Sequence, residues 1–118
     1  MLTRNLRNDQ WTKILEFLDE HPGVYVGEEA ECRRFIDGVL WIARTGAPWR
    51  DLPERYGNWN SVYQRFSRWG ERGIWTEMLN HFADDPDMEW VIVDSSVVRA
   101  HMSAAGASKK MAVRLHRL

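Results

Sequence analysis

Residues 59–75 most strongly limit the structure that this chain can form, because one face of this stretch is apolar and the other is polar and basic. At helical spacing its apolar side chains form one continuous stripe, made of Trp59, Val62, Tyr63, Phe66 and Trp69. The other face carries polar side chains and three guanidinium groups, from Ser61, Gln64, Arg65, Arg68 and Arg72. The stretch therefore predicts an amphipathic helix that buries an aromatic face and turns a basic face outward.

A helix of this kind has two interpretations. Arginine and amide side chains are the groups with which a recognition helix contacts bases in the major groove of DNA. An amphipathic surface helix whose arginines are merely solvated shows the same pattern, and for a single helix that interpretation is favoured. The flanking sequence has to decide between the two.

Three further helices are predicted around this one. The first covers about residues 8–18 and the second about residues 30–45, where Gly46 suits the left-handed position after a helix. Asn58 is expected to cap the basic helix, and the apolar spacing of residues 75–83 predicts a fourth helix. A helix, a compact connection and a basic helix in this order resemble a helix-turn-helix with a long turn.

The sequence period changes after an acidic, proline-containing segment at residues 84–87. Residues 89–94 form a short apolar run rich in β-branched side chains and predict a buried strand, with residues 95–101 as a second short strand. We therefore expect a mainly α fold. Residues 1–85 would form a helical, helix-turn-helix-like domain, and residues 86–118 would begin a truncated second domain that ends in an unstructured basic tail.

Composition and charge limit the class of protein. The single cysteine, Cys32, cannot form an internal disulfide, and we expect it to be buried and inert in a reducing compartment. No segment is apolar for the roughly 18 residues of a membrane span, so we expect a soluble cytoplasmic protein. The net charge is −1, but residues 32–72 hold eight basic and four acidic side chains, a local charge of +4. Such a basic region is compatible with a DNA-binding surface.

One acid stands where a metal-dependent enzyme could use it. Asp94 ends the predicted strand, and nucleases and strand-transfer enzymes hold divalent metal ions with groups of such carboxylates. The aspartates of residues 84–87 lie on the preceding linker, and His101 is the only histidine nearby in the sequence. The spacing alone therefore favours a strand-end cap over a catalytic acid.

Two segments resemble a known family. APWRDLPERYGNWNSVYQRFSRWGERGIW at residues 47–75 and MEWVIVDSSVVRAHMSAAGASKK at residues 88–110 are similar to the N-terminal half of insertion-sequence transposases of the IS-five group. These are DDE-class enzymes of DNA transposition and recombination. The resemblance covers about residues 2–110. It implies that the helical part binds the terminal inverted repeats, and that residues 90–94 open an RNase-H-like catalytic domain.

The resemblance also assigns roles to residues. Asp94 corresponds to the first of three metal-binding acids, so it is the implied catalytic residue and metal ligand of a complete enzyme that uses Mg²⁺ or Mn²⁺. With one acid of three, this chain alone is expected to be inactive and without bound metal. The expected DNA contacts are Asn60, Ser61, Gln64, Arg65, Arg68 and Arg72, with Arg50 and Arg55 as phosphate contacts.

The last eight residues, MAVRLHRL, depart from the family pattern, in which more of the catalytic domain follows. The consecutive lysines at residues 109–110 favour ribosomal slippage, so we expect an upstream-frame product or a frame-shifted remnant. The expected partners of this chain are double-stranded DNA and either a second copy of the chain or the missing half of the transposase. We expect it in the cytoplasm, associated with the bacterial nucleoid and not with a membrane. The alternative function is a helical interaction module, such as a transposition repressor, without sequence-specific DNA binding.

Overall fold

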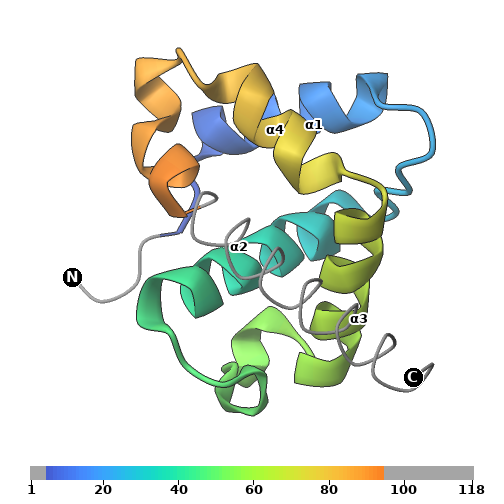
Figure 1. The fold of residues 1–118 in the computed structure, drawn as a ribbon. Helices are drawn as coiled ribbons and strands as arrows, with labels where there is room; N and C mark the ends of the chain where they lie inside the picture. Colours follow the sequence, from blue (N-terminus) through green and yellow to red (C-terminus); the bar gives the residue numbers. More distant parts are fainter. Residues whose placement is uncertain (1–4, 95–118) are drawn as a thin grey trace, which may run out of the picture.

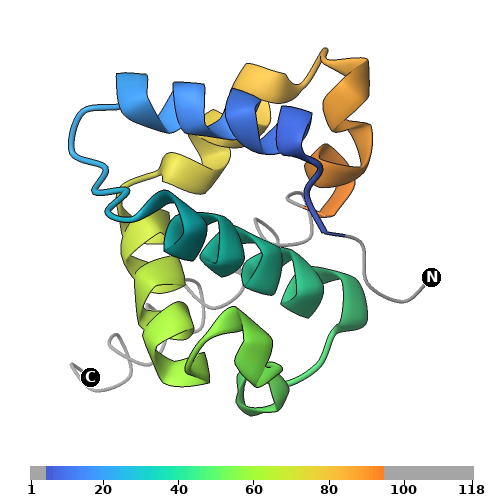
Figure 2. The ribbon, with the colours of Figure 1, turned by 180° about the vertical axis from the view of Figure 1, so that it is seen from behind.

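Helix α2 (Glu29–Thr45) runs through the middle of the computed structural model, which describes residues 5–94 (Figures 1 and 2). Helices α1 (Asn8–Glu20) and α4 (Ile74–Phe82) lie together on one side of α2. Helix α3 (Trp59–Glu71) runs across α2 and contacts α4. The four predicted helices are therefore confirmed, and with them the mainly α fold of the described residues.

The connection from α2 to α3 is compact. It consists of two 3-10 turns, η1 (Trp49–Asp51) and η2 (Glu54–Tyr56), and η2 packs on α2. A Cβ atom at Gly38 of α2 would lie 3.0 Å from the Cβ atom of Tyr56, so a larger residue at this position would require Tyr56 to shift. Gly46 ends α2 in the left-handed conformation, with a φ of 70°, as its sequence position predicted.

An aromatic cluster joins α2, α3 and α4. The ring of Trp75 lies 5.1 Å from that of Trp69, 5.8 Å from that of Phe66 and 5.9 Å from that of Phe35, measured between centroids. All four side chains are buried. Of the apolar face predicted for α3, Val62, Phe66 and Trp69 pack into the core, whereas Tyr63 is exposed and Trp59 is half-buried. Large aromatic rings give a small domain the buried area that it needs.

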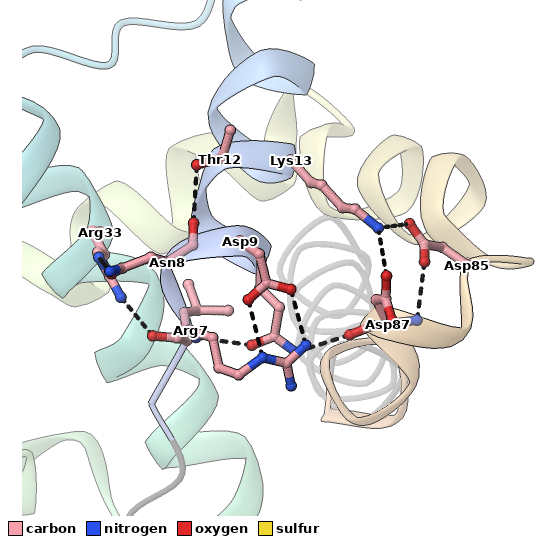
Figure 3. Close-up of polar contacts among 10 residues, drawn as sticks. Arg7, Asn8, Asp9, Thr12, Lys13, Arg33, Asp85 and Asp87 are labelled. Atoms are coloured by element: carbon pink, nitrogen blue, oxygen red, sulfur yellow. Dashed lines mark hydrogen bonds and ion pairs between the residues drawn. The ribbon is translucent and has the colours of Figure 1, made fainter.

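Ion pairs and hydrogen bonds tie α1 to its neighbours (Figure 3). Lys13 lies 2.7 Å from the carboxylate of Asp85, which caps the 3-10 turn η3 (Pro86–Met88), and 3.2 Å from that of Asp87 within this turn. On the other side, Arg33 of α2 donates a hydrogen bond of 2.8 Å to the side chain of Asn8. The segment after α4 is therefore fastened to α1 rather than extended away from the bundle.

Residues 89–94 are helical, so the predicted strand is wrong. Met88 and Val91 lie three residues apart and are both buried in the core, whereas Val93 is exposed. A strand needs a neighbouring strand for its backbone hydrogen bonds, and residues 5–94 contain none, whereas a helix satisfies its own backbone. The RNase-H-like domain is accordingly unconfirmed. The second predicted strand and the basic tail lie outside the described residues, and the domain boundary after residue 85 stays a prediction.

Two expectations from composition can be compared with the structure. The Cys32 side chain is fully buried, and this burial raises the pKa of its thiol to about 11, as expected of a core cysteine with little reactivity. Within the described part of the chain, none of the helices is both long and apolar enough to cross a bilayer.

Asp37 is a buried carboxylate in the middle of α2. Its side chain accepts a hydrogen bond of 2.9 Å from the backbone N–H of Leu6. Burial raises the pKa of this carboxyl, outweighing the Leu6 hydrogen bond and the charges of Arg33 and Arg44, which lower it. Since the folded pKa lies above the unfolded one, the ionised form of Asp37 destabilises the folded state.

We therefore expect Asp37→Asn, which keeps an oxygen acceptor for Leu6, to be more stable than the unmodified chain at pH 7. The ionised carboxylate destabilises the folded state fully at pH values above the folded pKa. At pH values below the unfolded pKa of about 3.9 this destabilisation is absent. The gain should therefore disappear as the pH falls to about 3. Urea unfolding at the two pH values measures it, and a lower midpoint for the variant at pH 7 would contradict this assignment.

Candidate nucleic-acid interface

The first turn of α3 is fixed by the Asn58 side chain. Its Oδ1 atom accepts hydrogen bonds from the backbone N–H groups of Asn60 and Ser61, at 3.0 and 3.2 Å. This confirms Asn58 as the predicted cap. No acidic side chain lies in this first turn, so the positive end of the helix dipole is not neutralised there.

Two of the predicted DNA-binding arginines contact the protein itself. Arg65 Nη2 donates to the carbonyl oxygens of Tyr25 and Val26, at 3.0 and 3.1 Å. Arg72 Nη1 donates to the carbonyl oxygen of Gly23 at 2.6 Å. All three carbonyls belong to residues 21–28, here called the connecting loop, which joins α1 to α2. One edge of α3 is therefore used to hold this loop.

The Arg65 guanidinium also packs on the aromatic cluster. Its Cζ atom lies 4.7 Å from the ring centroid of Phe35 and 5.4 Å from that of Trp69. The side chain is half-buried, whereas that of Arg68 on the same helix is exposed. A planar cation over aromatic faces, with a nitrogen bonded to carbonyls, is typical of a structural arginine.

Removing Arg65 should therefore destabilise the fold. We expect Arg65→Ala to lower the free energy of unfolding by about 1–3 kcal/mol, from the lost hydrogen bonds and ring contacts. Arg68→Ala is the matched control and should change it by less than about 0.5 kcal/mol, because that side chain is exposed. Denaturant unfolding compares the two, and equal losses would contradict the assignment.

The outward side of α3 carries a different set of residues. Asn60, Gln64 and Arg68 are spaced at i, i+4 and i+8, and all three side chains are exposed. Positions at this spacing lie above one another on one face of a helix. We call these three residues the polar ridge. Ser61 is also exposed, on the side of the ridge that faces Arg65.

The two predicted phosphate contacts lie in the turns that precede α3. Arg50 of η1 is exposed, and its Cζ atom lies 5.6 Å from the ring centroid of Trp59 at the start of α3. Arg55 of η2 is exposed too, with its Cζ atom 4.7 Å from the Tyr56 ring centroid. Since η1 and η2 both contact α3, the fold brings these cations to the same side of the bundle as the helix.

Tyr25, in the connecting loop, was not among the predicted site residues. Its side chain is 81% exposed, although the loop backbone on which it stands is held by Arg65 and Arg72. The loop has neither helical nor strand periodicity, so no local pattern drew attention to it. Its position next to α3 follows only from the tertiary fold.

Asp94, the implied metal ligand, lies beside Arg44 of α2. Its side chain is buried, and its Oδ2 atom is 3.5 Å from Arg44 Nε. Among residues 5–94, no group of three or more His, Cys, Asp or Glu side chains is placed to hold a metal ion. A divalent cation needs several oxygen ligands, so the described residues do not fit the Mg²⁺ or Mn²⁺ site implied for the family.

Comparison with known proteins places the chain among insertion-element proteins. Residues 6–79 match the profile of the family described as "Putative transposase of IS4/5 family (DUF4096)". The uncharacterized protein y4sN of Sinorhizobium fredii is 44% identical over 112 residues, which cover 95% of this chain and 90% of that protein. An uncharacterized 16.2 kDa protein of insertion element IS402 from Burkholderia cepacia is 32% identical over 87 residues, 67% of this chain and 56% of that protein. No solved structure matches.

Proposed function

This chain belongs to the IS4/5 family of transposases, and from that premise we propose that its helical domain binds double-stranded DNA at the terminal inverted repeats of an insertion element. The observation that carries the proposal is the polar ridge of Asn60, Gln64 and Arg68. Its three hydrogen-bonding side chains point outward from a helix whose opposite face is fixed by aromatic packing. A rigid helix with an exposed polar face can be placed in the major groove of DNA.

The chemistry of the ridge suits base recognition. Asn and Gln make paired hydrogen bonds to adenine, and Arg makes them to guanine. From Asn60 to Arg68 the helix rises about 12 Å. Laid along the groove, that length corresponds to about three or four base pairs at 3.4 Å each. The ridge is therefore long enough to read one short half-site.

The surroundings of α3 suit contacts to the DNA backbone. The helix begins without an acid in its first turn, so its dipole favours a phosphate near this end, while the N–H groups of Asn60 and Ser61 are already bonded to Asn58. Arg50 and Arg55 are exposed in the turns that lead into the helix and add two cations near this end. In this proposal Arg65 and Arg72 hold the connecting loop, and the ridge contacts the bases.

Fluorescence anisotropy tests the proposal. The unmodified chain is titrated into a labelled duplex that carries the terminal inverted repeat of its own element, called the repeat duplex, and into a shuffled duplex of the same composition. We expect tighter binding to the repeat duplex, and a salt dependence whose slope decreases by about one when Arg50 is replaced by alanine. Equal binding to both duplexes would contradict the proposal that the chain recognises the sequence of the repeat. An absence of binding would favour the helical interaction module.

A further inference from the structure

We propose that the connecting loop is a second DNA-contacting element, in which the Tyr25 hydroxyl donates a hydrogen bond to a phosphate at the border of the groove that α3 occupies. This inference rests on the proposed function, because it places α3 in the major groove. It adds a backbone contact from a part of the chain that lies outside the helix and its preceding turns.

The first support is the way the loop is fastened to α3. Arg65 donates to the carbonyl oxygens of Tyr25 and Val26, and Arg72 donates to that of Gly23. The two arginines are seven residues apart, or two helical turns, so the loop is held at two points along the helix. A loop held in this way keeps a fixed position relative to the polar ridge.

The second support is the state of the Tyr25 side chain. Its backbone carbonyl is bound, but the side chain is 81% exposed, so its hydroxyl is accessible to a ligand. Gly27 has a φ of 67°, and a Cβ atom there would lie 3.1 Å from the Tyr25 ring. The ring therefore lies against the backbone of Gly27, which contacts one side of the ring without burying it.

The third support is the geometry of the DNA groove. The major groove is about 12 Å wide, and a helix with its side chains is about 10–12 Å in diameter. A helix therefore fills the groove, so a loop fixed to its flank faces the sugar-phosphate strand that borders the groove. Tyrosine is among the side chains that hydrogen-bond to phosphate oxygens. The Tyr25 hydroxyl is a neutral donor, so this contact would add no positive charge beside the phosphate.

Tyr25→Phe tests the inference because it removes only the hydroxyl. We expect this variant to bind the repeat duplex about three- to tenfold more weakly. The loss should be equal on the shuffled duplex, and the salt slope should be unchanged, since no charge is removed. Urea unfolding is the control: because the Tyr25 side chain is 81% exposed, the variant should unfold at the same midpoint as the unmodified chain.

Ethylation interference locates the contact. With the unmodified chain, ethylation of the bordering phosphate should weaken binding, and Tyr25→Phe should lose this sensitivity at that phosphate alone. Wild-type affinity in Tyr25→Phe would overturn the inference while leaving the proposed function intact. A loss confined to the repeat duplex would indicate a base contact and would also overturn it. If the unmodified chain bound neither duplex, the proposed function would fail together with the inference.

Discussion

Arg68→Ala is expected to weaken binding to the repeat duplex by about 1–3 kcal/mol, or roughly 5- to 150-fold. The side chain is exposed at the end of the polar ridge, so its removal leaves the packing of α3 unchanged. The loss should be smaller on the shuffled duplex, because only the charge contact is lost there, whereas the repeat duplex also loses a paired hydrogen bond to guanine. Anisotropy titrations at one fixed salt concentration measure both losses.

A control must separate recognition from net charge. Arg34→Ala removes one exposed guanidinium from α2, where Arg34 borders a surface cavity with Trp11 and Glu29 and lies away from the polar ridge. It changes the net charge by the same amount as Arg68→Ala, and we expect less than a twofold effect on the preference between the two duplexes. If both variants lost the preference equally, the assignment of base reading to Arg68 would be contradicted.

The second large effect is on stability. Trp75→Ala should lower the free energy of unfolding by about 3–5 kcal/mol, because it empties the centre of the aromatic cluster. The ring contacts those of Phe35, Phe66 and Trp69, and its Nε1 atom donates a buried hydrogen bond of 3.0 Å to the Phe66 carbonyl oxygen. Since small domains are stable by only about 5–15 kcal/mol, the variant should be close to unfolding.

Urea unfolding of two variants tests this. Trp75→Phe keeps an aromatic ring and loses the Nε1 hydrogen bond, so it should lose clearly less stability than Trp75→Ala. If Trp75→Ala cost less than about 1 kcal/mol, the cluster could not be what fixes α3 on the bundle. The rigid presentation of the polar ridge would then need another explanation.

The helices could be predicted because their signals are local. The periodicity of the apolar side chains located α1 to α4, and the caps at Gly46 and Asn58 are where the sequence placed them. These features depend on residues within one or two helical turns of each other. Most of the apolar face of α3 was predictable for the same reason: the spacing located the buried Val62, Phe66 and Trp69, although Tyr63 of the same stripe is exposed.

Residues 89–94 could not be assigned from the sequence, because a short apolar run fits a buried strand and a buried helical segment equally. Packing against the rest of the fold favours the helical segment over the strand. Met88 and Val91 reach the core from one helical face, and Lys13 holds the preceding turn through Asp85. Neither contact is visible in the local pattern.

The sequence predicted which arginines lie on the polar side of α3, but not which of them contact the protein itself and which stay exposed. Helical spacing puts Arg65, Arg68 and Arg72 on one side of α3, and long side chains at the edge of a buried face can turn either way. Their partners decide the direction. Arg65 and Arg72 contact a loop 39 to 49 residues away in the sequence, whereas Arg68 stays exposed. DNA contact by all eight residues first proposed stays a prediction.

The most direct test of the polar ridge is side-chain NMR of the ¹⁵N-labelled chain during titration with the repeat duplex. If the polar ridge contacts the bases, the side-chain amide signals of Asn60 and Gln64 and the Nε–H signal of Arg68 shift on binding. If these three signals stayed at their positions in the DNA-free protein while the chain bound the duplex, α3 would not be the recognition element.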